Sequence, residues 1–154
     1  MVDFCSVLNN AGQEERRSEL EGQVEASPDS YRKSMQRSRT LGDRFLISIT
    51  FESTGQISGL TTITVRKESP TIIYQGMTGV KRKFCGRGLG KWLKADMLLK
   101  ISKRYPEVTY ISTGNANNNA PMLSINNRLG FKMHKHVRAY KFNLEDLINQ
   151  FNIQ

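Results

Sequence analysis

Residues 45–51 have aromatic and β-branched side chains at every second position, and this period of two predicts a strand. The polar residues 52–55, which end in glycine, predict a tight turn. The β-branched run over 56–65 then predicts a second strand that closes a hairpin. A third strand is predicted over 71–80, although its internal glycines weaken a strand unless another backbone or a ligand approaches closely.

A different period begins at Leu89, where apolar residues recur at every fourth position as far as Ile101. This spacing aligns them on one face of an amphipathic helix, which we expect to end before Pro106. Trp92 and Met97 are expected in the core. The expected polar face carries Lys91, Lys94, Asp96 and Lys100.

Capping residues and shorter periodic runs predict the remaining elements. In chain order these are a helix over 27–40 capped by Ser27, a strand over 108–113, a helix over 119–129, one long or two short strands over 131–142, and a helix that begins at Asn143. Strands therefore alternate with helices after the hairpin. This order predicts an α/β (α+β) fold with a mixed sheet.

The first 26 residues differ in composition from the rest of the chain. They are polar and are expected to be irregular to about Gly12, and a charged helix with little apolar face is predicted over 13–22. We therefore divide the chain into a polar N-terminal segment, 1–26, partly helical or disordered, and one domain over 27–154. A chain of 154 residues with 38% hydrophobic residues is long enough to bury the core of one such domain.

Positive charge is concentrated near the middle of the sequence. The net charge is +9, which favours an anionic partner such as nucleic acid, acidic lipid or a polyphosphate. The acidic residues concentrate before residue 30, whereas lysines and arginines crowd between residues 81 and 94. We therefore expect the positive field to be focused on one loop.

Membrane insertion and export are not indicated. No run approaches the roughly 18 consecutive apolar residues of a membrane span, and the first residues lack the basic start and apolar run of a signal peptide. Two cysteines, Cys5 and Cys85, make neither a disulfide framework nor a zinc site. We expect a cytoplasmic protein without a metal centre.

Three glycines, Gly86, Gly88 and Gly90, lie between the third strand and the amphipathic helix. Glycine leaves backbone N–H groups unshielded, and the N–H groups in the first turn of a helix have no intrahelical partners. Together with the helix dipole and the neighbouring cations, this arrangement favours phosphate binding. Tight packing of the turn is the alternative interpretation.

Two common phosphate-binding motifs do not fit this turn. A P-loop would need glycine in place of Cys85 and serine or threonine in place of Trp92. A dinucleotide fingerprint would need a third small residue in place of Lys91 or Leu93. The spacing excludes both.

The segment 80–91 (VKRKFCGRGLGK) resembles the pyrophosphate-binding motif of the GNAT N-acetyltransferase superfamily, in which a strand ends in valine and an RGxGxG-like sequence opens a helix. Residues 111–131 (ISTGNANNNAPMLSINNRLGF) resemble the strand, asparagine-led helix and LGF that follow in that family. The resemblance covers roughly residues 27–142. It is strongest to the second halves of tandem bacterial GNAT proteins, including the mycothiol synthase type.

The resemblance implies a mixed, mostly antiparallel central sheet flanked by helices, whose usual first strand has no clear counterpart before Ser27. It also implies that acetyl-CoA binds with its pantetheine arm along the third strand and its pyrophosphate at the glycine turn. Arg87 and Lys91 would add charge, and Asn119 would contact the pantetheine as well as cap a helix. The implied cofactor-binding residues are Met77, Thr78, Gly79, Val80, Cys85, Gly86, Arg87, Gly88, Leu89, Gly90, Lys91 and Asn119.

Two residues depart from the family's pattern. Cys85 stands where the family usually has glutamine or arginine, and we expect a small space-filling residue there rather than a nucleophile. Asn126 stands where many members have a tyrosine that protonates the CoA thiolate, and an amide is no general acid. No carboxylate takes the place of a catalytic base, so Gln75 is expected to hold a water that does this work. Gln75 and Asn126 are the candidate catalytic residues.

Three hypotheses for the function follow. The first is an N-acetyltransferase that transfers the acetyl group of acetyl-CoA to a primary amine of a small molecule or peptide. The second is a non-catalytic acyl-CoA-binding module that regulates a partner. The third, a basic nucleic-acid-binding domain, is disfavoured because the chain lacks the aromatic-rich strands of single-strand binders. The missing first strand indicates a trimmed fold, a fragment of a tandem protein, or a piece supplied by a partner, and an incomplete sheet edge favours a homodimer or a partner domain that completes the sheet.

Overall fold

In the computed structural model, the described residues are 4–9, 27–138 and 140–151. Within them, four strands form one sheet in the order β1-β2-β3-β4. The strands β1, β2 and β3 are antiparallel neighbours, and β4 runs parallel to β3. The predicted mixed, mostly antiparallel sheet is therefore confirmed. The strands are β1 (Arg44–Phe51), β2 (Ile57–Val65), β3 (Ile72–Val80) and β4 (Tyr110–Thr113).

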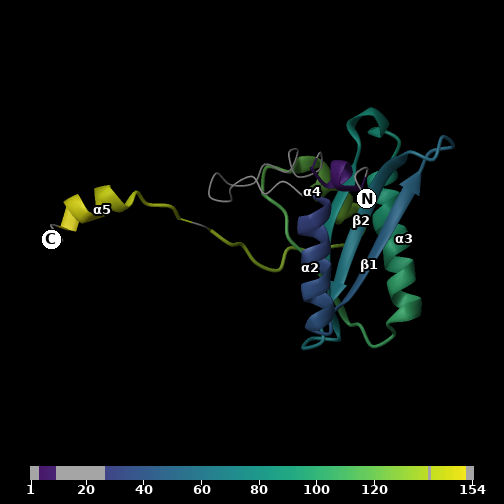
Figure 1. The fold of residues 1–154 in the computed structure, drawn as a ribbon, viewed down its shortest axis with the longest axis horizontal. Helices are drawn as coiled ribbons and strands as arrows, with labels where there is room; N and C mark the ends of the chain where they lie inside the picture. The colour runs from purple at the N-terminus through teal and green to yellow at the C-terminus, as the bar shows by residue number, and fades with distance from the viewer. Residues whose placement is uncertain (1–3, 10–26, 139, 152–154) are drawn as a thin grey trace.

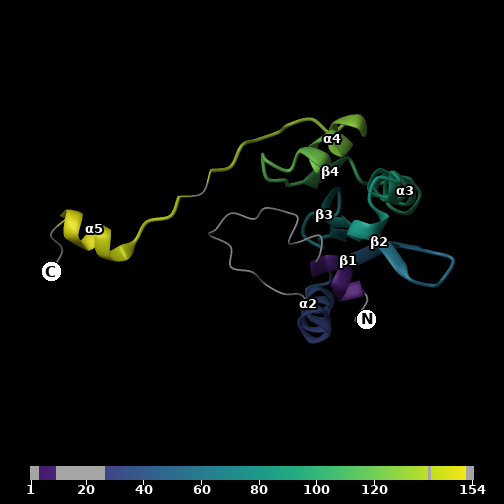
Figure 2. The same cartoon turned by 90° about the horizontal axis from the view of Figure 1, so that it is seen from above.

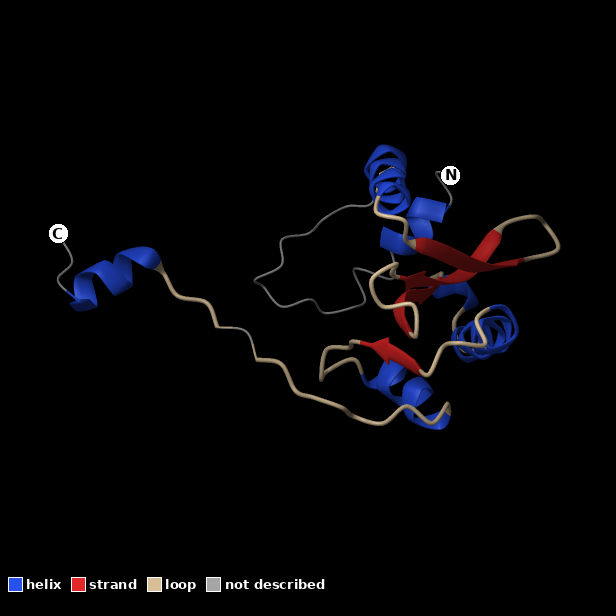
Figure 3. Cartoon of the chain, turned by 90° about the horizontal axis from the view of Figure 1, so that it is seen from below, coloured by secondary structure: helices blue, strands red, loops and turns tan. Residues whose placement is uncertain are grey.

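Helices cover both faces of this sheet (Figures 1 and 2). The helix α2 (Pro28–Thr40) lies on one face, whereas α3 (Leu89–Arg104) lies on the other and α4 (Ala120–Arg128) lies beside β4. Figure 3 shows the strands between these helical layers. As predicted, the Ser27 side chain caps α2 by accepting a hydrogen bond from the Ser30 backbone N–H at 3.1 Å. No helix in the described ranges is long and apolar enough to cross a membrane.

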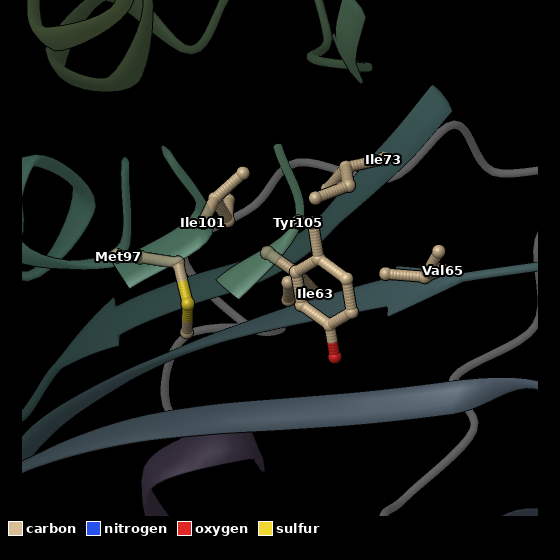
Figure 4. Packing of buried hydrophobic residues seen from close by; sticks show 6 residues of the cluster. All are labelled: Ile63, Val65, Ile73, Met97, Ile101 and Tyr105. Carbon is tan, nitrogen blue, oxygen red and sulfur yellow. The ribbon is translucent and has the colours of Figure 1, made fainter. Parts of the chain in front are cut away.

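The larger hydrophobic cluster joins α3 to the sheet (Figure 4). Branched side chains of β2 and β3 interlock there with the apolar stripe of α3, as the two periods of the sequence predict. This packing fixes the N-terminus of α3, and with it the glycine turn, at the end of β3. The buried members are Ile63, Val65, Ile73, Met97, Ile101 and Tyr105.

The buried face of α3 differs in part from the prediction. Trp92, expected in the core, is exposed, so that prediction is wrong. Lys94, expected on the polar face, is only 1% exposed, and that prediction is wrong as well. The reason is geometric, because Lys94 follows the buried Leu93 and lies one turn before Met97, so the helix carries it on the face that packs inward.

A second cluster lies on the opposite face of the sheet. Phe4, Val7 and Leu8 belong to a helix over residues 4–9 and pack with Leu60 of β2. The expectation of an irregular opening is therefore wrong for these residues, whose spacing of three and four makes a short apolar stripe. The charged helix predicted over 13–22 lies outside the described residues, and the domain boundary at residue 26 stays a prediction.

The chain leaves the body after α4 and runs outward to α5 (Leu144–Phe151), which lies apart from the sheet (Figure 1). Residues 131–138 and 140–143 form no strand, so the strands predicted over 131–142 are wrong. Alternating side chains make a strand only where a neighbouring edge pairs with the backbone, and this segment has no such neighbour in the described structure. We call residues 131–138 and 140–151 the C-terminal arm.

Candidate functional site

Pairing between β3 and β4 ends half-way along β3. The register begins with Ile72 opposite Tyr110 and ends with Gln75 opposite Thr113. On its other edge, β3 stays paired with β2 as far as Val80. Backbone N–H and C=O groups over residues 77–80 therefore face an opening instead of a neighbouring strand.

A β-bulge precedes the opening. The register between β2 and β3 shifts between Thr61 and Ile63, where two steps along β2 correspond to three along β3. Gly76 lies in this bulge, and a Cβ atom there would be 2.5 Å from Thr62 Oγ1. The glycines within this strand suggested that another group comes close to its backbone. At Gly76 that group is the neighbouring strand β2.

A cavity of about 700 Å³ occupies the opening. Its walls come from β3, the glycine turn, the start of α3, the loop after β4, and α4. The volume lies within the range of small-molecule sites. Of the predicted cofactor-binding residues, all except Arg87 line it, and Gln75 lines it too. The fold thus gathers residues that are up to 44 positions apart in sequence, from Gln75 to Asn119.

The glycine turn presents bare backbone to this cavity. Gly86 and Gly88 have φ angles of 80° and 78°, which L residues rarely adopt, and no atom of the described residues lies within 4 Å of a Cβ at either position. Gly88 is the N-cap of α3 and supplies no side-chain hydrogen bond. The first-turn N–H groups of α3 are therefore open to a ligand acceptor. Gly90 instead packs against α4, since its Cβ would be 3.4 Å from Ile125 Cδ1.

The two side chains on either side of Gly86 have protein partners. The Cys85 thiol donates to the backbone carbonyl oxygens of Val80 and Lys81, each at 3.7 Å, which fits the predicted space-filling role. The Arg87 guanidinium donates to both carboxylate oxygens of Glu52 at 2.9 Å. This hydrogen bond from Arg87 holds the pKa of Glu52 below its usual value. A phosphate contact by Arg87 stays a prediction.

Gln75 closes the inner end of the cavity wall, at the last pair of the β3–β4 ladder. Its side chain is 7% exposed, and its Nε2 donates to Thr61 Oγ1 at 3.4 Å. Its Oε1 is buried and accepts no hydrogen bond from any described residue. A buried acceptor without a donor costs roughly 1–3 kcal/mol, so a bound N–H or O–H group would be stabilised there.

Asn126 is buried behind the cavity instead of lining it. Its Oδ1 accepts a hydrogen bond from Lys94 Nζ, and its Nδ2 donates to Asn115 Oδ1 at 2.6 Å. Lys94 and Asn115 both line the cavity. Burial lowers the pKa of Lys94 to about 8. Sequence reasoning missed Lys94, although its spacing from Gly90, Met97 and Ile101 matches the buried face of α3.

Asn119 caps α4, as predicted. Its Oδ1 accepts a hydrogen bond from the Met122 backbone N–H at 3.2 Å, and the residue also lines the cavity. A pantetheine contact by Asn119 is a further prediction. In the described parts of the chain, no three His, Cys, Asp or Glu side chains gather closely enough to hold a metal ion.

Solved acetyltransferases share this architecture. The tandem GNAT protein from the clavulanic acid biosynthesis pathway aligns with a TM-score of 0.62 and 33% identity, over 67% of this chain and 32% of that protein. Glucosamine-6-phosphate N-acetyltransferase from Arabidopsis thaliana aligns with a TM-score of 0.61 and 16% identity, over 92% and 90%. The fold is that of the GNAT acetyltransferases.

A third GNAT structure holds a CoA-derived ligand. AAC(6')-Iy, solved with the bisubstrate analogue CoA-S-monomethyl-acetylneamine, aligns with a TM-score of 0.62 and 13% identity, over 91% of this chain and 92% of that one. The aligned part of this chain spans about a third of the tandem GNAT protein. No protein-family model and no curated protein matches the sequence. The predicted GNAT resemblance is confirmed for the fold, and the mycothiol synthase type stays a prediction.

Proposed function

We propose that this protein transfers the acetyl group of acetyl-CoA to a primary amine. One observation carries the proposal: the edge of β3 beyond Gln75, which pairs with no described strand, leads directly into the uncapped amides of the glycine turn, and both line one cavity. A strand edge suits an extended chain with amide groups, and a helix N-terminus suits phosphate. The acetyltransferase neighbours, and the CoA-derived ligand of one of them, support the same assignment.

Different residues of the cavity would bind different parts of the cofactor. The backbone of residues 77–80 would pair with the pantetheine amides, and the amides over 86–90 would hold the pyrophosphate. Lys91, on the first turn of α3, would add positive charge. The cofactor supplies an acetyl group activated as a thioester. Fixing that thioester against the amine is the main contribution expected of the protein.

The amine would enter at the inner end, near Gln75. Gln75 Oε1, which has no donor among the described residues, can accept an N–H of the amine or hold a water that receives its proton. No carboxylate lines the cavity in the described chain, so water is the expected proton acceptor. The acceptor has to arrive as the neutral amine in order to attack the carbonyl carbon.

Isothermal titration with acetyl-CoA tests the cofactor site, with two matched variants. Gly88→Glu places a strained residue and a negative charge at the glycine turn. Gly55→Glu makes the same change in the β1–β2 hairpin, at a glycine whose φ is 80° against 78° at Gly88 and whose Cβ would likewise meet no described atom within 4 Å. We expect Gly88→Glu to abolish binding and Gly55→Glu to retain it. Equal loss in both variants, or no binding by the unaltered protein at millimolar ligand, would refute the proposal.

A non-catalytic acyl-CoA-binding module is the second candidate. It is favoured because no described residue of the cavity wall is a carboxylate and because the Asn126 amide is hydrogen-bonded to Lys94 and Asn115. Release of free thiol from acetyl-CoA, measured across a panel of primary amines, separates the two functions. Binding with no release above the blank for any amine supports the module, and amine-dependent release excludes it.

We also propose that a second copy or a partner domain completes the sheet. The outer edge of β1 pairs with no strand in the described structure, and free edges of this kind favour association. Light scattering over a range of concentrations tests this, and a monomer at every concentration contradicts the homodimer. The cytoplasm stays the predicted compartment.

A further inference from the structure

Lys94 lines the cavity and brings an ammonium group to its wall. It lies one helical turn after Gly90 on α3, a rise of roughly 6 Å, so it lies deeper along the cavity than the glycine turn. Its Nζ donates to Asn126 Oδ1 and lies 5.4 Å from the centre of the Phe131 ring. With 1% exposure, it is among the largest fully buried side chains of the protein.

The position of Lys94 along β3 follows from the strand register. The ladder between β3 and β4 ends with Gln75 opposite Thr113. Asn115 lies two residues beyond Thr113 and lines the cavity, and Asn126 links Asn115 to Lys94 through two hydrogen bonds. The lysine therefore reaches the cavity where the two strands part. On the proposed function, this is the inner end of the pantetheine channel, where the thioester sulfur arrives.

We propose that Lys94 is a catalytic residue that gives its proton to the CoA sulfur as the thioester is cleaved; this inference rests on the proposed acetyl transfer. The amine nitrogen forms a bond to the acetyl carbon, and the carbon–sulfur bond breaks with its electron pair moving to sulfur. Sulfur then takes a proton from Lys94 Nζ. The new amide nitrogen loses its extra proton to water, and solvent reprotonates Lys94. Asn126 is the positioning residue that holds the lysine by its Oδ1.

The surroundings of Lys94 suit an acid of this kind. Burial lowers the pKa of the ammonium to about 8, which is close to that of an ordinary thiol near 8.5, so proton transfer to sulfur is nearly balanced. The other charged or titratable groups facing the cavity are Lys91 from α3, Arg128 from α4, and Cys85 from the glycine turn. None is a carboxylate, so no anion in the described wall competes for the proton.

CoA itself is the probe for this inference, because its free thiol is the product that forms when Lys94 gives its proton to the sulfur. The ultraviolet absorbance of the thiolate is followed against pH for CoA bound to the protein, to Lys94→Met, and to Lys103→Met. Lys103 is an exposed lysine in the last turn of the same helix and gives a matched charge change. We expect the unaltered protein and Lys103→Met to lower the thiol pKa of bound CoA by about one unit, a tenfold change in its ionisation constant.

In Lys94→Met, the thiol of bound CoA should titrate no lower than in free CoA. Equal thiol titration in the unaltered protein and Lys94→Met overturns the inference, because a purely structural lysine would not move it. If Lys94→Met fails to fold, the unaltered protein decides alone, and an unshifted thiol overturns the inference. Once an amine acceptor is in hand, Lys94→Met should lose about a hundredfold in kcat with little change in KM for acetyl-CoA.

Failure of the inference and failure of the proposed function give different results. If the unaltered protein binds no CoA, the proposed acetyl transfer fails and the lysine inference falls with it. If it binds CoA and acetylates an amine but leaves the thiol unshifted, acetyl transfer stands and only the role of Lys94 is overturned.

Discussion

Replacing Lys94 by methionine should change fold stability in a way that depends on pH. Burial lowers the pKa of this lysine from 10.5 to about 8. Between those values, the unfolded chain binds a proton that the folded chain does not, so the free energy of unfolding rises with pH across this window. The gap between the two pKa values corresponds to about 3 kcal/mol, which is the cost of the buried ammonium near pH 7.

Methionine removes that cost but also removes a hydrogen-bond donor. Asn126 Oδ1 then stays buried without Lys94 Nζ, at a cost of roughly 1–3 kcal/mol. The two terms nearly cancel, so Lys94→Met should range from equally stable to about 2 kcal/mol more stable than the unaltered protein near neutral pH. The variant would lose its proposed proton donor and lose no stability.

Urea unfolding at several pH values between about 7 and 10 measures both effects. As pH rises, the free energy of unfolding of the unaltered protein should increase relative to that of Lys94→Met, because only the unaltered protein carries Lys94. Lys103→Met, with its exposed side chain, should show no such shift. Parallel pH curves for Lys94→Met and the unaltered protein would refute the reasoning, because they would mean that the ammonium is hydrated in the folded state.

Three further changes test other parts of the structure. Gly76→Ala should cost about 1–3 kcal/mol in urea unfolding, because its Cβ would lie 2.5 Å from Thr62 Oγ1, and the loss should shrink in a Thr62→Ala background; an equal loss there contradicts the contact. Tyr31→Phe should raise the unfolding free energy by about 1 kcal/mol, since its buried hydroxyl has no partner among the described residues, and a large loss would reveal one. Glu52→Gln should free the Arg87 guanidinium and tighten CoA binding a few-fold in low salt by isothermal titration, whereas an unchanged affinity would leave Arg87 outside the site.

Local patterns predicted most of the sheet and its helices because those patterns coincide with what the core requires. The alternation over 45–51 became β1, and the stripe ending at Ile101 became the buried face of α3. The strands expected over 131–142 failed because pairing is a non-local event that alternation alone does not report. The helix over residues 4–9 was missed because its short apolar stripe is stable only against Leu60 and the second face of the sheet.

The candidate site was predictable where backbone geometry dictates sequence. The αL conformations at Gly86 and Gly88 require glycine, so the turn was visible in the chain. Lys94 was not visible, because a charged residue in an amphipathic helix is usually solvated, and its ammonium contacts residues distant in sequence, Asn126 and Phe131. Asn126 was singled out for its position, but its hydrogen bonds to Lys94 and Asn115 depend on three-dimensional contacts.

The C-terminal arm carries seven of the twelve large apolar side chains that are exposed in the described structure. A surface that covered them in solution would determine how the stability of this protein responds to dilution. Burial within the same molecule would make the melting temperature independent of concentration. Burial between molecules would make the stability depend on protein concentration. Each tenfold dilution of a dimer would then lower its apparent stability by about 1.4 kcal/mol. The residues are Met133, Val137, Tyr140, Phe142, Leu144, Ile148 and Phe151.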